Sequence, residues 1–299
     1  MFRLPLFAAL AALSVPAVFA APCGGHGTRE TLLVSGTWLE AHRGDAKLAI
    51  VAIGQKSDYE QAHIPGSVFL DYAEIRGDGA LTLEIPPMPT IAAVFGKAGV
   101  NDDSRIVLYS LRAVDAANAR AYVTLDAAGF GAQTSILDGG FNLWRAEQRP
   151  VTADVPAVTP GKITPCPQSD VIAALDDVRG AIHRPGVSLV DARTAAYFSG
   201  ESSTDNRAGH IPGAVNLNFS SLADANGKLK SIDDLRGQFS AAGIAAGDRL
   251  VTYCHIGQQA SLIYFVARLL GYDARLYDGS WEEWARHPEL PVENPKRTR

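Results

Sequence analysis

The sequence predicts an α/β fold built twice, in which each copy is a parallel sheet flanked by helices. Short apolar runs typical of buried strands alternate with helical patterns in both halves of the chain. The tetrapeptide His-Ile-Pro-Gly stands at residues 63–66 and again at 210–213. In each half it is followed by an Asp-Gly pair shortly before a tryptophan, at 138–139 and at 278–279. Two motifs that recur in one order indicate that the halves are repeats with loops of different length.

In the first half, apolar runs at 48–53, 105–109 and 135–137 predict three strands. A helical pattern at 116–128 lies between the second and the third. Parallel strands need a crossover connection, which is usually a helix. We therefore expect a parallel sheet with helices on both faces.

The second half repeats this order. Apolar runs at 187–191, 249–253 and 274–277 predict strands, and the pattern at 259–270 predicts a helix. Gly271 follows that helix directly, where a glycine in the left-handed conformation commonly ends a helix.

Composition and repeats together divide the chain. The segment between the halves is rich in Pro, Thr, Val and Ala with little periodicity, as expected of an interdomain linker. We predict a signal peptide at 1–20, a first domain at 28–150, a linker at 151–167 and a second domain at 168–295.

The first twenty residues have the features of a signal peptide. Arg3 precedes a long apolar stretch, and Val18-Phe19-Ala20 offers small residues at the two positions that a signal peptidase reads. The alternative is an uncleaved membrane anchor, but the stretch contains two prolines and is of marginal length for spanning a bilayer. We therefore expect an exported protein, periplasmic or secreted, without membrane contact after cleavage.

The composition is that of an ordinary globular protein. Hydrophobic residues make up 47% and charged residues 20% of the 299 residues, and the formal net charge is −5. A weakly acidic chain without basic runs argues against nucleic acid as a partner. Since the sequence has neither a glycine-rich phosphate loop nor metal-ligand spacing, we expect no cofactor and no metal.

The three cysteines are too few for a disulfide scaffold. Cys23 stands at the mature N-terminus and Cys166 in the linker, so a disulfide between them is one hypothesis for an oxidising compartment. Cys254 is then the odd thiol, which calls for an explanation in an exported protein.

Cys254 opens a loop suited to anion chemistry. It stands between the strand at 249–253 and the helix at 259–270, where parallel sheets bind ligands. Loop amides and the helix dipole are expected to lower the pKa of this thiol and to hold a terminal persulfide. A buried, inert cysteine is the alternative, but the glycine and glutamines beside it favour a polar site. The predicted cradle consists of His255, Ile256, Gly257, Gln258, Gln259 and Ala260.

These features resemble the two-domain rhodanese family, the thiosulfate and 3-mercaptopyruvate sulfurtransferases. The resemblance rests on the His-Ile-Pro-Gly motifs, the Cys254 loop, and the segments Val190-Asp191-Ala192-Arg193 and Asp278-Gly279-Ser280-Trp281. It implies that Cys254 is the nucleophile that takes sulfane sulfur as a persulfide and passes it to cyanide or a thiol. It also implies an inactive first half, which agrees with Ser110 at the cysteine's place, and a pocket between the halves with Arg112 on one wall.

The donor is less well defined by the sequence. Phosphatases of the Cys-x5-Arg type need an arginine where Ala260 stands, so phosphate lacks its clamp. Animal thiosulfate enzymes carry Arg and Lys directly after the cysteine, whereas this loop has His255 alone. The loop is similar to that of several bacterial thiosulfate enzymes, and we therefore favour thiosulfate over 3-mercaptopyruvate.

Two arginines and several supporting residues complete the predicted site. Arg193 and Arg207 are the candidates for substrate binding. The alternatives are an ion pair of Arg193 with a nearby acid and a solvated loop charge for Arg207. His255 is a candidate general base. Support is expected from Asp191, Asp278 and Trp281.

Three functions therefore remain open. The first is an exported sulfurtransferase, the second a persulfide carrier for a protein partner, and the third a module that binds an anion without chemistry. Cys254→Ser would abolish activity in the first and persulfide loading in the second, yet leave anion binding in the third.

Overall fold

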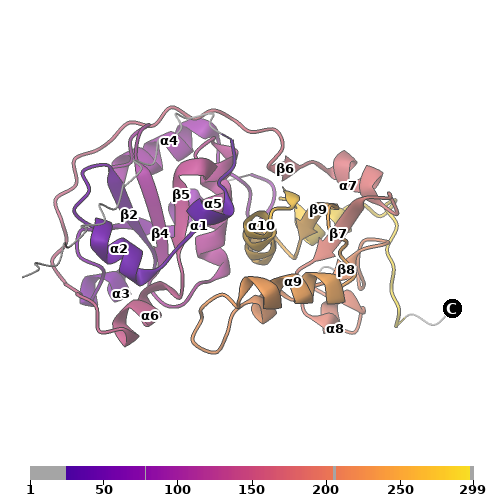
Figure 1. Ribbon diagram of the computed structural model, residues 1–299. Coiled ribbons are helices and arrows are strands. Elements are labelled where there is room, and N and C mark those ends of the chain that lie inside the picture. The colour runs from indigo at the N-terminus through magenta and orange to yellow at the C-terminus, as the bar shows by residue number, and fades with distance from the viewer. Residues whose placement is uncertain (1–24, 78, 205–206, 297–299) are drawn as a thin grey trace, which may run out of the picture.

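The computed structural model describes residues 25–77, 79–204 and 207–296 and contains one five-stranded parallel sheet in each half (Figure 1). The strand orders, β1-β5-β4-β2-β3 and β6-β10-β9-β7-β8, place corresponding strands in corresponding positions, so the α/β fold built twice is confirmed. The first sheet comprises β1 (Leu33–Val34), β2 (Leu48–Gly54), β3 (Val68–Asp71), β4 (Arg105–Ser110) and β5 (Thr134–Leu137). The second comprises β6 (Ile172–Ala173), β7 (Val187–Asp191), β8 (Val215–Asn216), β9 (Arg249–Tyr253) and β10 (Asp273–Tyr277).

Helices connect these strands in both halves. The first half contains α1 (Arg29–Leu32), α2 (Gly36–His42), α3 (Lys56–Gln61), η1 (Tyr72–Ile75), α4 (Met88–Lys97), α5 (Ala116–Ala127), η2 (Gly131–Gln133) and α6 (Gly140–Ala146), where η marks a 3₁₀ turn. The second contains α7 (Leu175–Ala181), α8 (Ala195–Phe198), η3 (Phe219–Leu222), α9 (Ile232–Ala241), α10 (Gln258–Leu270) and α11 (Ser280–Ala285).

The predicted central strands and the two long helices are confirmed, and the structure adds short edge strands. β1, β6 and β8 have two residues each, which is too short for any periodicity to be read from the sequence. Alternate residues of β2 pack into different apolar clusters: Val51 and Ile53 on one face, Ile50 and Ala52 on the other. Both faces of the sheet are therefore covered, as its parallel strands require.

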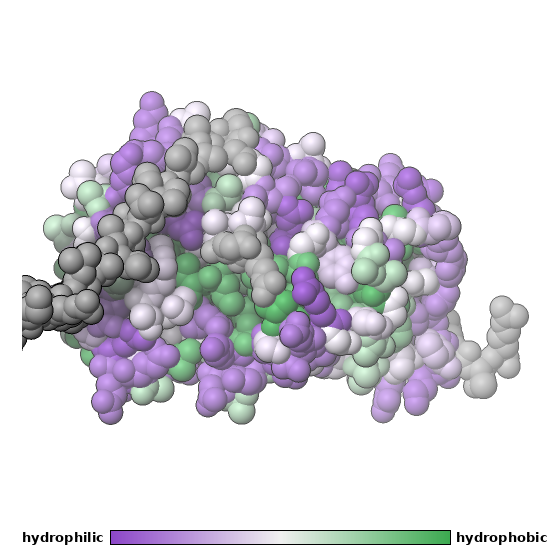
Figure 2. Space-filling view, in the orientation of Figure 1, coloured by the Kyte–Doolittle hydropathy of each residue, from purple (hydrophilic) through white to green (hydrophobic). Residues whose placement is uncertain are grey.

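The two halves meet through α5 and α10, which pack side by side between the sheets (Figure 1). The rings of Tyr122 and Phe265 touch edge to face, with their centroids 5.0 Å apart. One apolar cluster contains residues of both helices and of both sheets, so the halves share a core. In Figure 2 apolar residues gather along this seam, while polar side chains dominate the outer surface of each half. Within the described part of the chain, no helix combines the length and apolarity needed to cross a membrane.

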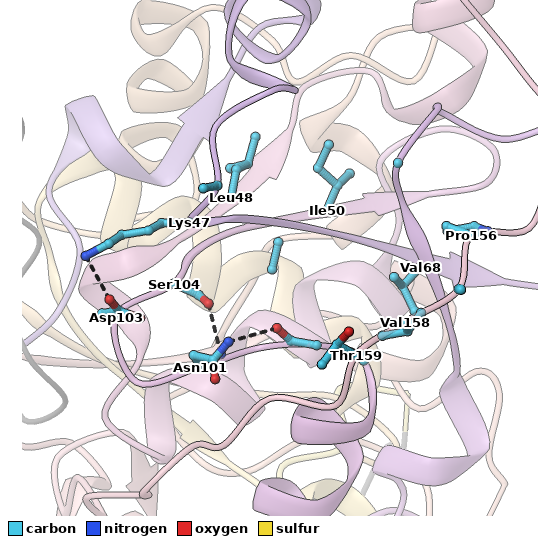
Figure 3. A pocket seen from close by; sticks show the side chains of 16 residues that line it. Lys47, Leu48, Ile50, Val68, Asn101, Asp103, Ser104, Pro156, Val158 and Thr159 are labelled. Atoms are coloured by element: carbon cyan, nitrogen blue, oxygen red, sulfur yellow. Dashed lines mark hydrogen bonds and ion pairs between the residues drawn. The ribbon is translucent and has the colours of Figure 1, made fainter.

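The segment between the halves lies along the first half. Gly161 donates a backbone hydrogen bond to Gly96, and Cys166 donates one to Ala128 at the end of α5. A cavity of about 400 Å³ opens between this segment and β2, and its polar groups bond one another, including Lys47 with Asp103 (Figure 3). Cys166 is disulfide-bonded. Its predicted partner Cys23 and the predicted signal peptide lie outside the described residues, so that pairing stays a prediction.

A histidine near the N-terminus joins the two halves. The Nδ1 atom of His26 lies 3.0 Å from Asp126 of α5, and Nε2 lies 2.9 Å from Asp170. Asp126 also accepts a 2.7 Å hydrogen bond from the Tyr264 hydroxyl of α10. The hydrogen bond to Asp126 raises the pKa of the His26 imidazole above its ordinary value, although burial opposes this.

Stability should therefore depend on pH through His26. A raised pKa in the folded state stabilises the fold fully below the unfolded value of about 6.5, and this contribution is lost as the pH rises through the folded pKa. We expect His26→Gln to lower the free energy of unfolding in urea more at pH 5.5 than at pH 8.5. His42→Gln is the control, because His42 bonds to a carbonyl of its own helix. An equal loss at both pH values for His26→Gln would contradict the expectation.

Candidate active site

Cys254 lies at the carboxyl end of β9, a central strand of the second sheet, immediately before the loop that leads into α10. Its side chain is completely buried and is a free thiol. The position follows from the strand pattern at 249–253, and the structure brings three of the predicted cradle residues, Ile256, Gln259 and Ala260, to this sulfur.

Backbone amides surround the sulfur. The N–H groups of Ile256, Gln259 and Ala260 donate hydrogen bonds to the Cys254 sulfur, and each lowers its pKa. Burial raises the pKa by more, so the pKa of Cys254 lies above its ordinary value. The expectation of a lowered thiol pKa is therefore wrong for this buried site, because desolvation of the thiolate outweighs the amides. The same amides would stabilise the negative terminal sulfur of a persulfide.

Gly257 gives the loop its shape. It precedes α10 with a φ of +82°, which favours glycine. A Cβ there would stand 2.9 Å from the Asp278 carbonyl oxygen and 3.1 Å from Arg120 Nη1. The loop, the Asp-Gly motif of the second half and helix α5 of the first half therefore meet at this residue.

We expect Gly257→Ala to reduce persulfide formation about ten-fold or more. The left-handed backbone costs a non-glycine residue about 1–2 kcal/mol, and the crowded Cβ must displace the loop from the sulfur. Gly271→Ala is a matched control, since Gly271 ends the same helix with a φ of +91° and nothing lies within 4 Å of its Cβ position. It should lower the thermal midpoint but leave the rate of persulfide formation unchanged. Equal rates for both variants would show that the packing at Gly257 does not matter.

The first turn of α11 is hydrogen-bonded to the Cys254 loop. The Cys254 N–H donates to Ser280 Oγ at 3.2 Å, and the Trp281 N–H donates to the Cys254 carbonyl at 3.0 Å. The Glu282 N–H likewise donates to the His255 carbonyl at 2.9 Å. Trp281 is fully buried, as packing support requires. Ser280 was not among the predicted residues; its place directly after Asp278-Gly279 was the signal that could have identified it.

Arg193 forms a buried ion pair. Its guanidinium donates to both carboxylate oxygens of Asp191, at 2.6–3.1 Å, and to the Gly209 carbonyl at 2.7 Å. It also lies 4.5 Å from the centre of the Trp281 ring. Arg193 is only 2% exposed, so the alternative of an ion pair with Asp191 describes its position better than donor contact.

Arg207 holds the C-terminal segment. Its guanidinium donates to the carbonyls of Trp284, His287 and Leu290, at 2.6–3.3 Å. A guanidinium engaged by three carbonyls braces the chain after α11, and the predicted substrate contact of Arg207 stays untested.

His255 lies beside the sulfur loop. Its ring stands edge-on to Tyr197, with centroids 4.5 Å apart, and Nδ1 lies 3.4 Å from the Thr204 hydroxyl. The neighbouring Gln259 has a buried side-chain oxygen without a partner among the described residues. The role of His255 in proton transfer stays a prediction.

Asp278 connects the site to the first half. One carboxylate oxygen pairs with Arg120 of α5, and the other accepts a 2.7 Å hydrogen bond from the Ile85 N–H. Sequence reasoning missed Arg120, because nothing in its local pattern shows that α5 faces the other half. The predicted wall residue Arg112 is instead 74% exposed and lies near Asp58.

The first half contains a counterpart of this site, whose residues are hydrogen-bonded to one another and to the second half. Ser110, at the place of the cysteine, donates to Asp115 at 2.8 Å. The loop after it is bonded to the second half, since the Val114 N–H donates to the Gly227 carbonyl. Asp138 corresponds to Asp278 and accepts a 3.0 Å hydrogen bond from the Leu229 N–H. The Asp-Gly motif of each half thus accepts a backbone hydrogen bond from the other half, in a pseudo-symmetric arrangement.

Comparison with known proteins adds independent evidence on the family of this chain. The family model described as Rhodanese-like domain matches residues 35–147 and 174–287, once in each half. The thiosulfate sulfurtransferase of Azotobacter vinelandii is 30% identical over 265 residues, covering 88% of this chain and 97% of that protein. The 3-mercaptopyruvate sulfurtransferase of Escherichia coli K12 is 29% identical over 281 residues, covering 89% and 99%.

A solved structure is similar over most of the fold. The crystal structure of SseA from Escherichia coli, described as a 3-mercaptopyruvate sulfotransferase, aligns with a TM-score of 0.74 at 28% identity. The alignment covers 84% of this chain and 99% of that chain. Relatives of both donor classes are therefore similar to this protein along nearly their whole length.

Proposed function

Because the chain belongs to the rhodanese family of sulfurtransferases, we propose that it moves sulfane sulfur from thiosulfate through a persulfide on Cys254 to cyanide or a thiol. The single observation that carries this proposal is the free thiol of Cys254 enclosed by three backbone N–H donors at the amino end of α10. Such a cradle suits a sulfur that becomes negative during the reaction.

The proposed cycle has two displacements. The Cys254 thiolate attacks the outer sulfur of thiosulfate, a new S–S bond forms, and sulfite leaves with the electron pair of the broken bond. The amides of Ile256, Gln259 and Ala260 then hold the negative end of the persulfide. Cyanide attacks that terminal sulfur, thiocyanate forms, and the thiolate is released. Burial raises the pKa of the Cys254 thiol. The thiol must therefore lose its proton before it attacks the donor anion.

The choice of thiosulfate rests on similarity. The relative from Azotobacter vinelandii carries that name. The loop that opens with Cys254-His255 also resembles the loops of several bacterial thiosulfate enzymes. 3-Mercaptopyruvate is the second candidate donor, because the relative from Escherichia coli carries that name at almost the same identity. We also propose export to the periplasm or medium, on the grounds of the apolar stretch within residues 1–20.

Intact mass spectrometry of the protein purified from its native compartment tests these points together. Exposure to thiosulfate should add one sulfur to the wild type, cyanide should remove it, and Cys254→Ser should gain none. Loading by 3-mercaptopyruvate alone would replace the proposed donor. A mature mass that still contains residues 1–20 would contradict cleavage and export by this route.

A further inference from the structure

The first half places buried hydrogen-bond donors without partners beside the cysteine loop. Arg120 of α5 is fully buried, and only its Nη1 atom is bonded, to Asp278. Its Nε and Nη2 atoms have no partner among the described residues. The hydroxyl of Tyr72, in η1, is likewise buried and unpartnered there. A buried donor left without a partner destabilises the fold, so such a cluster calls for a ligand or water.

Arg120 lies at the amino end of α10. The Cβ position of Gly257 stands 3.1 Å from Arg120 Nη1, so the guanidinium touches the residue that caps α10. Burial raises the pKa of Tyr72 to about 12, and the Arg120 guanidinium and the Cys254 sulfur both lie close enough to act on that hydroxyl. Tyr72 and Arg120 belong to η1 and α5, which pack against each other in the first half, and Arg120 lies beside the Cys254 loop.

The carboxylates near Arg120 and Tyr72 already have hydrogen-bond partners. Asp278 is satisfied by Arg120 and by the Ile85 N–H. Asp115, the other acid that acts on Tyr72, accepts from Ser110 and from the Asn118 N–H. The second arginine that acts on Tyr72, Arg76, donates to the Thr82 carbonyl. Both carboxylates are thus committed, whereas the planar fork of Arg120 still offers the donors that suit sulfonate or carboxylate oxygens.

We propose that Arg120 and Tyr72, both from the half without the cysteine, bind the oxyanion end of the sulfur donor while Cys254 takes its sulfur. This inference rests on the proposed function and makes the first half part of the substrate site. The role that the sequence suggested for Arg193 and Arg207 then falls to Arg120, because both of those guanidinium groups are engaged by Asp191 or by backbone carbonyls.

Calorimetric titration of the full-length Cys254→Ser protein separates binding from chemistry. Sulfite serves as the probe for the sulfonate end and pyruvate as the probe for a carboxylate. Adding Arg120→Lys keeps a cation for Asp278 but removes the fork, and we expect sulfite to bind about ten-fold or more weakly. Adding Tyr72→Phe removes one donor, and about three-fold or more is expected.

Matched controls guard against indirect effects. Arg249→Lys alters an exposed arginine that pairs with Asp273 at the opposite end of β9, and Tyr272→Phe removes a hydroxyl from the segment after α10. Neither should change sulfite binding. If Arg120→Lys does not fold, Tyr72→Phe still tests the subsite.

The outcomes differ from a failure of the proposed function. Sulfite binding that neither variant weakens, or the absence of both sulfite and pyruvate binding to Cys254→Ser, would overturn the inference even if wild-type Cys254 loads sulfur from thiosulfate. Pyruvate binding that depends on Arg120 and Tyr72 would support the subsite and assign it to a carboxylate donor. Failure of the wild type to load any sulfur would overturn the proposed function independently.

Discussion

Cys254→Ser is expected to lower sulfurtransferase turnover by at least about 10³-fold while the native fold is kept. A serine hydroxyl in this loop would face the N–H groups of Ile256, Gln259 and Ala260, which donate hydrogen bonds and cannot take its proton. It would therefore stay protonated and form no bond to sulfur. Turnover of thiosulfate with cyanide, followed as thiocyanate, measures the effect.

Folding of the variant must be measured in parallel. Serine is close in size to cysteine, and its hydroxyl oxygen can accept the same backbone N–H groups, so the free energy of unfolding should change by less than about 1.5 kcal/mol. Ser110→Ala in the first half is the matched control; it removes the bond to Asp115 and should leave turnover unchanged. Turnover above a tenth of the wild-type value in Cys254→Ser would refute the persulfide route. Loss of turnover in Ser110→Ala would refute the view that the residue at the cysteine's place in the first half takes no part in sulfur transfer.

Local pattern was sufficient to locate the sulfur but not its surroundings. The run at 249–253 and the helix at 259–270 place Cys254 between a central strand and a helix, and the structure has both elements within one residue of the predicted ends. Arg120 could not be found in this way. Its charge sits in the middle of α5, almost all of which is buried, and only the packing of α5 on α10 explains why a charge is tolerated there.

The error about the thiol pKa has the same origin. The loop and the helix dipole can be inferred from sequence, and both favour the thiolate. Cys254 is completely buried, and its loop is held by contacts with α11 that sequence does not show. Since desolvation scales with burial, the sign of the shift was decided by tertiary contacts.

The two Asp-Gly motifs are expected to differ sharply in their effect on stability. Asp278 and Asp138 each accept a backbone N–H from the opposite half, Ile85 and Leu229 respectively. Asp278 also compensates the charge of Arg120, which is fully buried. The cation near Asp138 is Lys228, which is 53% exposed and 3.8 Å away.

Asp278→Asn should therefore lower the free energy of unfolding by about 3–5 kcal/mol, the usual effect of leaving a buried charge without its partner. Asp138→Asn should change it by less than about 1 kcal/mol. Burial raises the pKa of Asp138, so its charged form is already disfavoured by folding, and an uncharged amide relieves that cost. Urea unfolding at pH 7 measures both variants.

The comparison isolates charge from geometry. Asparagine keeps an oxygen that can accept the backbone N–H at either position, so the seam between the halves retains its hydrogen bonds in both variants. Equal changes in the two variants would mean that the charge of Asp278 adds nothing to stability and that water compensates Arg120. A large loss confined to Asp278→Asn would mean that the buried cation of the first half depends on the Asp-Gly motif of the second. In that case the ion pair beside the Cys254 loop also stabilises the contact between the halves.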